Sequence, residues 1–212
     1  MLRKLAKENR LYQISVPVIA LTGGIGSGKT TVANILESQG FPIINADQLV
    51  KTIYQKKSSL EFIQNNFPEC IVNNQIDFKK LRELVFSIPE NKKLVENFIY
   101  PQMEETFLQK LNEFSEKRFV IYDVPLLFER GLHPLVDYII LAYTDKEHQI
   151  QRVMSRDHVS RELALKIIEA QMSLDDKKKM SDYIVDNSRG LEELKADVLL
   201  LSSKLLAFFN KE

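Results

Sequence analysis

Short apolar runs alternate with stretches of helical periodicity along most of the chain. The first run, residues 16–22, is rich in β-branched side chains and ends at glycines, which is typical of a buried parallel strand. Apolar positions then recur at helical spacing over 29–39, and Gly40 provides a C-terminal stop. A second apolar run at 41–44 completes a strand–loop–helix–strand unit. This order favours an α/β fold built on a parallel sheet.

Three further apolar runs predict the remaining strands, at residues 119–124, 138–142 and 183–185. The long stretch between the second and third strands has helical patterns but no central strand. We therefore expect a helical insertion at 48–118, inside a core formed by 16–47 and 119–212. Residues 1–15 form an extra N-terminal arm to which the sequence assigns no role.

Two predicted helices follow the strand at 138–142. The string Thr144-Asp145-Lys146-Glu147 resembles a capping box and opens a helix through about residue 156. Residues 160–172 are expected to form its antiparallel partner, so that about 145–172 makes a helical lid. A last amphipathic helix at 191–209 is expected to pack on the sheet.

Composition is that of an ordinary globular protein: of 212 residues, 44% are apolar and 27% charged. Twenty-nine basic residues balance 29 acidic ones, which argues against a general nucleic-acid binder. One cysteine and three scattered histidines exclude a disulfide framework and a zinc module. Because apolar runs are short and the start is charged, we expect neither a membrane helix nor a signal peptide. The expectation is a cytoplasmic monomer without nucleic-acid or membrane partners.

Four of the seven glycines fall within residues 23–28, in a string that fits the phosphate-loop motif G-x-x-x-x-G-K-[ST] at every fixed position. Such glycines let backbone N–H groups converge on an anion, and the following helix adds its positive dipole end. Lys29 can reach the β- and γ-phosphates, and the Thr30 hydroxyl can ligate Mg²⁺. The expected nucleotide contacts here are Gly24, Ile25, Gly26, Ser27, Gly28, Lys29, Thr30 and Thr31. A glycine-rich turn is the alternative, but the position between strand and helix favours nucleotide binding.

The rest of the chain favours a small-molecule kinase among phosphate-loop proteins. A guanine-reading N-K-x-D motif is missing, since the nearest string, Asn91-Lys92-Lys93-Leu94, lacks the aspartate. Phosphoryl transfer then requires positioning, charge neutralisation and one base that receives the acceptor's proton.

Two aspartates follow predicted strands at the edge where open α/β sheets bind ligands. Asp47 is the best candidate for the base, and its alternative role is the N-cap of a helix beginning near Gln48. Asp123 resembles a Walker B residue near the metal, and its alternative is a turn aspartate before Pro125.

Basic side chains supply candidate phosphate contacts. Arg152 and Arg156 share one helix face, and with Arg161 they can close over transferring phosphates or form a solvated, ion-paired face. The cluster Lys79, Lys80 and Arg82 can meet an anionic substrate or be plain surface. The run Lys177-Lys178-Lys179 is expected to be solvated.

These residues resemble the dephospho-coenzyme A kinase family. The likeness runs from the phosphate loop through Asn45-Ala46-Asp47, Leu81-Arg82 with Val85-Phe86, Pro125-Leu126-Leu127-Phe128-Glu129, Arg152 with Arg156-Asp157, Gln171, and Asp182 to Asn187. The string P-L-L-F-E with the A-D and R-D elements is far more specific than a phosphate loop alone.

The resemblance implies a fold and a reaction. The fold is the three-layer α/β/α sheet of phosphate-loop NTPases, with a helical substrate-binding insertion and a helical lid. The reaction moves the γ-phosphoryl group of ATP, with Mg²⁺, to the ribose 3′-hydroxyl of dephospho-CoA. Asp47 becomes the base, Lys29 and Arg156 the other catalytic residues, and Arg152 and Asn187 nucleotide contacts. Substrate contacts are implied for Arg82, Tyr100, Leu126 and Glu129, and a metal contact for Thr30 and Asp123.

Two positions depart from the family pattern. Asn45 stands where an aspartate is common, so it can hydrogen-bond but brings no charge, and Tyr100 stands where the family often has histidine. Two other functions stay open as alternatives: a different small phosphate-loop kinase acting on a nucleoside or nucleoside monophosphate, and a catalytically silent nucleotide-binding regulator.

Overall fold

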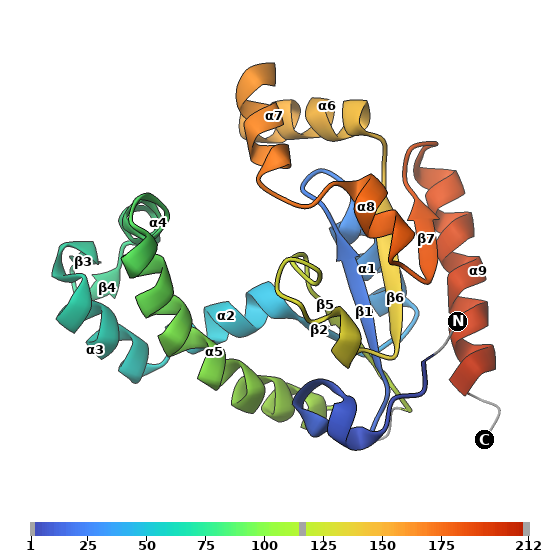
Figure 1. Ribbon diagram of the computed structural model, residues 1–212, viewed down its shortest axis with the longest axis horizontal. Coiled ribbons are helices and arrows are strands. Elements are labelled where there is room, and N and C mark those ends of the chain that lie inside the picture. Colours follow the sequence, from blue (N-terminus) through green and yellow to red (C-terminus); the bar gives the residue numbers. More distant parts are fainter. Residues whose placement is uncertain (1–2, 115–117, 210–212) are drawn as a thin grey trace. The chain divides into compact units, whose positions relative to one another are not determined.

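The computed structural model describes residues 3–114 and 118–209 (Figure 1). The chain divides into two compact units. The first unit combines Met1–Asn45 with Glu116–Glu212, and the second is Ala46–Ser115. No helix in the described ranges is both long enough and apolar enough to cross a membrane.

A five-stranded parallel sheet forms the centre of the first unit, in the order β2-β5-β1-β6-β7. The strands are β1 (Val18–Gly23), β2 (Ile43–Asn45), β5 (Val120–Asp123), β6 (Tyr138–Tyr143) and β7 (Tyr183–Asp186). Each coincides with one of the predicted apolar runs to within two residues at either end. The predicted α/β fold with a parallel sheet is therefore confirmed.

Helices surround this sheet. They are α1 (Lys29–Ser38), α6 (Lys146–Asp157), α7 (Arg161–Glu169), α8 (Leu174–Lys179) and α9 (Leu191–Phe209). One continuous apolar cluster joins α1 and α9 to alternate residues of the strands, including Ile19, Ile121 and Ile140 opposite Leu36 and Leu201. Every residue of β1 is buried, as a central strand covered on both faces requires.

The second unit is mostly helical. Its elements are α2 (Ala46–Tyr54), α3 (Lys57–Asn66), the hairpin β3 (Ile71–Val72) and β4 (Gln75–Ile76), α4 (Phe78–Ser87) and α5 (Pro89–Asn112). Within it the rings of Phe62 and Phe98 stack with their centroids 4.0 Å apart, and the Ser59 hydroxyl donates to the Ile53 carbonyl over 2.6 Å. These contacts join α3 to α5 and to α2 and give the unit its own interior.

A buried ion pair ties the N-terminal arm to the first unit. The fully buried Asp137 carboxylate accepts hydrogen bonds from Arg10 Nε at 2.7 Å and Nη2 at 3.0 Å. It also accepts from the backbone N–H groups of Leu5 and Val18, each at 2.8 Å. The remaining Arg10 donors reach three carbonyl oxygens of the arm. The arm is thus fixed beside the start of β1.

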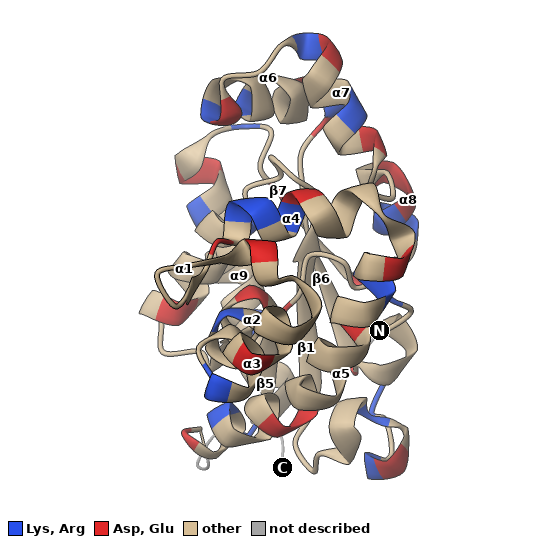
Figure 2. Cartoon of the chain, turned by 90° about the vertical axis from the view of Figure 1, so that its left-hand side faces the viewer, with Lys and Arg blue, Asp and Glu red and all other residues tan. Residues whose placement is uncertain are grey.

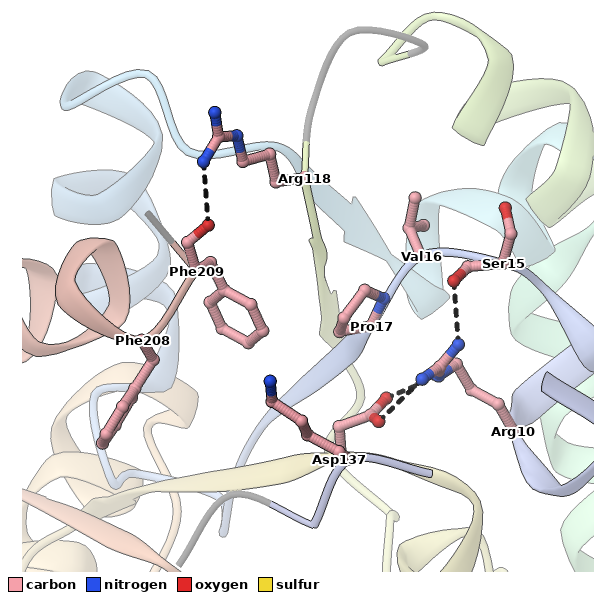
Figure 3. Close-up of a pocket in the computed structure, with 9 residues that line it drawn as sticks. Arg10, Ser15, Val16, Pro17, Arg118, Asp137, Phe208 and Phe209 are labelled. Atoms are coloured by element: carbon pink, nitrogen blue, oxygen red, sulfur yellow. Dashed lines mark hydrogen bonds and ion pairs between the residues drawn. The ribbon is translucent and has the colours of Figure 1, made fainter. Parts of the chain in front are cut away.

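A cavity of about 570 Å³ lies next to this pair (Figure 3). Arg10, Asp137 and Pro17 border it together with Phe208 and Phe209 from the end of α9. Because Pro17 and Asp137 precede β1 and β6, the cavity lies at the edge of the sheet where the strands begin. The phosphate loop follows the other end of β1, so the cavity and the loop lie at opposite ends of this strand.

Two local predictions are wrong. Asp145 rather than Thr144 caps α6, because its side chain accepts a hydrogen bond from the His148 backbone N–H at 2.9 Å. Lys177, expected to be solvated with its neighbours Lys178 and Lys179, is fully buried. Neither error changes the fold.

Candidate nucleotide and catalytic site

The phosphate loop runs from the end of β1 to the start of α1. Gly26 and Gly28 have φ angles of +75° and +87°, which a residue with a side chain adopts only under strain. A side chain at position 28 would also lie 1.9 Å from the Asn187 amide nitrogen, and one at position 23 would lie 2.5 Å from the Ser27 hydroxyl. Conformation therefore favours glycine at positions 26 and 28, and space favours it at positions 23 and 28.

Side chains from distant segments hold the carbonyl oxygens of this loop. Gln149 Nε2 donates to the Ile25 carbonyl at 2.8 Å, and Arg152 Nη1 donates to the Gly26 carbonyl at 3.2 Å. Asn187 Nδ2 donates to the Ser27 carbonyl at 3.0 Å, and Lys177 Nζ donates to the Gly23 carbonyl at 3.1 Å. Two N–H groups of the loop are also engaged by the protein, since Ile25 N–H donates to Gln171 Oε1 at 2.9 Å and Ser27 N–H to the Gly24 carbonyl at 3.1 Å. The N–H groups of Gly24, Gly26 and Gly28 make no such contact among the described residues and can face an anion.

The Ser27 side chain adds a donor to the same loop. It is fully buried, and its hydroxyl has no hydrogen-bond partner among the residues that the structure describes. Buried polar groups are almost always paired, so an unpaired hydroxyl in a phosphate loop fits a ligand oxygen as its partner. Loop geometry and donor set together suit a nucleotide phosphate.

Lys29 and Asp123 form an ion pair at the carboxyl edge of the sheet. The Asp123 carboxylate is almost fully buried, and its second oxygen accepts a hydrogen bond from the Asn45 amide at 2.6 Å. Asp123 lies opposite Asn45 in β2 and opposite Leu21 in β1, so strand register brings the three segments together. The phosphate-loop lysine and the acid predicted near the metal are therefore neighbours.

The predicted lid consists of α6 and α7, which share a small apolar cluster of Ile150, Val153, Ala164 and Ile168. Ile25 of the phosphate loop packs against this cluster, which places the lid beside the loop. Both α6 and α7 contain basic as well as acidic residues, coloured blue and red on the ribbon of Figure 2.

Arginines of the lid make different contacts. Arg152 reaches the phosphate loop and also donates to the Asn187 carbonyl at 2.8 Å. Arg156, with its side chain 60% exposed, forms two hydrogen bonds of 2.8 Å with Asp157, which hold the pKa of that carboxyl below its ordinary value. Arg161 is paired in the same bidentate way with Glu147. Only Arg152 of these three contacts the loop in this state.

The residues predicted to meet the acceptor are divided between the two units. In the first unit, Glu129 accepts from Lys177 Nζ at 2.8 Å and from the Met172 N–H at 3.1 Å, and Leu126 is exposed. In the second unit, Arg82 is exposed on α4 and Tyr100 is exposed on α5.

Asp47 also belongs to the second unit, where it is exposed in the first turn of α2. Because α2 begins at Ala46, Asp47 lies inside the helix rather than before it. The alternative prediction, that Asp47 is the N-cap of a helix starting near Gln48, is wrong.

Two residues that hold the phosphate loop were not predicted. Gln149 is 5% exposed and lies four residues before the buried Val153 on α6, so a polar residue on the apolar face of a helix was the available signal. Lys177 was hidden within a run of three lysines, which resembles a solvated surface.

The sequence profile of the dephospho-CoA kinase family matches residues 17–193 of this chain. A dephospho-CoA kinase of Fusobacterium nucleatum is 40% identical over 183 residues, which span 85% of this chain and 94% of that protein. One from Bacillus licheniformis is 36% identical over 186 residues, spanning 85% of this chain and 92% of the other.

Solved structures agree with these matches. The Thermus thermophilus protein TT1252 superimposes with a TM-score of 0.80 at 33% identity, covering 90% of this chain and 98% of its own. Dephospho-CoA kinase from Campylobacter jejuni gives a TM-score of 0.66 at 28% identity, covering 89% of this chain and 96% of its own. The fold, the phosphate loop and the extent of these matches lead to one conclusion: the chain belongs to the dephospho-CoA kinase family.

Proposed function

We propose that this protein transfers the γ-phosphoryl group of ATP to the ribose 3′-hydroxyl of dephospho-CoA, giving CoA and ADP, the final step of coenzyme A biosynthesis. The observation that carries the proposal is a complete phosphate loop, with Lys29 beside a buried Asp123, in a chain that belongs to the family over most of its length. The family supplies the acceptor, and the loop supplies the site for the donor.

The phosphates of ATP bind inside the loop formed by residues 24–31. Lys29 leaves Asp123 and moves to the β- and γ-phosphates, where its charge opposes the charge that develops during transfer. Asp123 and the Thr30 hydroxyl would hold Mg²⁺, which would neutralise phosphate charge there. One carboxylate and one hydroxyl suit this ion, which prefers a few protein oxygens together with phosphates and water.

Asp47 is the proposed general base. Its carboxylate accepts the proton of the 3′-hydroxyl as that oxygen attacks the γ-phosphorus and the bond to the ADP oxygen breaks. The assignment rests on the match of Ala46-Asp47 to the family motif and on exposure of the side chain at the start of α2.

Arginines complete the proposed site. Arg152 fixes the loop and, with Asn187, borders the nucleotide. Arg156 exchanges Asp157 for phosphate oxygens when the lid engages ATP, which its exposed position permits. Residues 48–118 are proposed to hold the CoA moiety, with Arg82 and Tyr100 as contacts there and with Leu126 and Glu129 as contacts from the first unit.

We propose further that the enzyme is a cytoplasmic monomer without nucleic-acid or membrane partners. The balanced charge of the chain supports the part of this proposal that concerns nucleic acids, since a nucleic-acid binder usually carries a net positive face.

An acceptor panel tests the function. ADP release is followed with Mg·ATP and, separately, dephospho-CoA, AMP, CMP, UMP, adenosine or no acceptor. Turnover confined to dephospho-CoA supports the proposal. Turnover with a nucleoside or monophosphate instead would retain a kinase and reject the acceptor, and ATP binding without turnover on any acceptor would indicate a silent regulator.

A further inference from the structure

Lys177 is the one member of its lysine run that is buried. Its side chain has no exposed surface, whereas the side chains of Lys178 and Lys179, next to it in α8, are exposed. A buried ammonium is costly unless it is paired and hydrogen-bonded, so its partners indicate what it is there to hold.

Those partners use all three donors of the ammonium group. Lys177 Nζ lies 3.1 Å from the Gly23 carbonyl oxygen, 3.1 Å from the Pro125 carbonyl oxygen and 2.8 Å from Glu129 Oε1. Gly23 is the last residue of β1 and opens the phosphate loop. Pro125 and Glu129 are the two ends of the P-L-L-F-E segment that follows β5. One side chain therefore connects the phosphate loop to this segment.

Other contacts reinforce the same connection. The Thr22 hydroxyl donates to the Pro125 carbonyl at 3.2 Å, and the Met172 N–H, shortly after the end of α7, donates to Glu129 at 3.1 Å. Without Lys177, the Glu129 carboxylate would keep only the Met172 contact among those described, and the Gly23 carbonyl would lose its side-chain donor. A well-packed apolar residue often stabilises a protein as much as a buried ion pair does, so stability alone does not explain a lysine here.

We infer that Lys177 is a positioning residue for phosphoryl transfer. It fixes the phosphate loop relative to the 125–129 segment, and so aligns the γ-phosphoryl group with the acceptor that this segment helps to hold. This inference rests on the proposed function. Lys177 itself does not touch the reacting atoms in this scheme, because its three donors are already engaged by the protein.

The central test compares Lys177→Met with Lys178→Met, the same change at the exposed neighbour. Lys177→Met is expected to lower kcat by about 10²-fold, the effect of displacing aligned reactants by about an ångström. The KM for ATP should change by less than about threefold, because Gln149, Arg152 and Asn187 still hold the loop. Lys178→Met should match the wild type, and Lys177→Arg should recover part of the lost kcat.

Counting active sites separates positioning from simple loss of folded protein. Mg·ADP binding by calorimetry gives the number of sites, and kcat is expressed per site. A normal kcat per site in Lys177→Met, with fewer sites or a lower melting temperature, would mean that the residue is only structural and would overturn the inference.

A double-mutant cycle with Glu129→Gln tests whether Lys177 acts on turnover through its contact with Glu129. If Lys177 acts partly through Glu129, the double variant loses less than the product of the two single losses. Independent, multiplying losses would reject the connection.

If Lys177→Met does not fold, the variants Lys177→Arg and Glu129→Gln are used in its place. A lower kcat with retained Mg·ADP binding in both variants supports the inference. A wild-type kcat in both variants rejects it. Wild-type protein silent with dephospho-CoA would overturn the proposed function and this inference together, whereas an active wild type with an unaltered Lys177→Met overturns only the latter.

Discussion

The Lys29 ammonium is paired with the Asp123 carboxylate at the carboxyl edge of the sheet. Both residues have further roles in the proposed function: Lys29 as a phosphate contact and Asp123 as a metal contact. Exchange of the ion pair for phosphate and Mg²⁺ would then leave neither of the two charges unpaired.

Lys29→Met is expected to reduce turnover by about 10²-fold or more, because a cation at the transferring phosphates is lost. It should also lower the melting temperature of the nucleotide-free protein, since Asp123 is left buried without its ion-pair partner. The double variant Lys29→Met/Asp123→Asn should regain stability but not turnover. Wild-type kinetics in Lys29→Met would contradict the assignment of the phosphate loop.

Asp47→Ala is expected to lower turnover with dephospho-CoA by about 10²-fold or more, as loss of a general base does. ATP binding, measured by calorimetry, should survive because the phosphate loop is unchanged. Glu37→Gln, which alters an exposed acid on α1, is the control and should behave as wild type. Near-normal turnover in Asp47→Ala would remove Asp47 from the mechanism.

The central parts of the fold were predictable because their signals are local. A buried parallel strand is a continuous apolar run, and the phosphate loop is a string of adjacent residues, so β1 and the loop through Lys29 follow from sequence alone. The hairpin at β3 and β4 had a signal that was missed: Asn73 and Asn74, with φ angles of 49° and 61°, suit the left-handed positions of a tight two-residue turn.

Contacts between distant segments were not predictable in the same way. Lys177, Lys178 and Lys179 are identical in type, and only the placement of α8 decides which of them is buried. Likewise, Thr144 and Asp145 are both good caps, and the choice depends on where the backbone turns after β6. Arg152 was predicted to be a nucleotide contact on its motif, whereas its contact with the Gly26 carbonyl depends on tertiary structure and could not be read from the sequence.

Asn45→Asp places a second carboxylate where the Asn45 amide now donates to Asp123 at 2.6 Å. Two close carboxylates raise the pKa of one of them above its unfolded value. The resulting loss of folding free energy is absent at low pH, where the carboxyl with the raised pKa is protonated in both the folded and the unfolded state. The loss grows as the pH rises above about 4. We expect the variant to have a lower melting temperature than the wild type at pH 8 without Mg²⁺, and we expect Mg²⁺ to reduce this difference in melting temperature. A difference that is the same from pH 4 to 8, measured by thermal denaturation, would contradict this interpretation.

Asp145 connects the stability of the lid to pH. Hydrogen bonds from the His148 backbone N–H, and then from its ring, hold the pKa of the Asp145 carboxyl below its ordinary value. A depressed folded-state pKa stabilises the protein above the unfolded pKa of about 3.9, and this contribution is lost as pH falls through the folded value.

Asp145→Ala should therefore lower the free energy of unfolding by about 1 kcal/mol at neutral pH, the usual effect of losing an N-cap. The difference from wild type, measured by urea denaturation, should shrink below about pH 4. Thr144→Ser, which keeps a hydroxyl at the position first predicted to cap α6, is the matched control and should retain the wild-type pH dependence. An equal loss of unfolding free energy at pH 3.5 and pH 7 would show that the charge of the Asp145 carboxylate does not stabilise the start of α6.

The N-terminal arm supplies a stability determinant remote from the chemistry. Arg10→Met leaves the Asp137 carboxylate buried without the Arg10 guanidinium as its partner. It should lower the free energy of unfolding by about 3–5 kcal/mol, the usual effect of breaking a buried ion pair. Arg3→Met is the control from the same arm: the Arg3 side chain is 38% exposed and lies 3.6 Å from Asp182, so its loss should cost less than about 1 kcal/mol.

Arg10→Met/Asp137→Asn should recover part of the loss, because the uncompensated charge is gone. The recovery is only partial because the backbone N–H groups of Leu5 and Val18 use different oxygens of Asp137, and the asparagine amide keeps one of them. Folded Arg10→Met protein, assayed well below its melting temperature, should keep its kcat, since the phosphate loop lies at the other end of β1. Urea denaturation of the wild type, Arg10→Met, Asp137→Asn and the double variant gives the coupling energy between the two side chains. Equal stabilities of Arg10→Met and Arg3→Met would mean that the buried pair does not hold the arm in place.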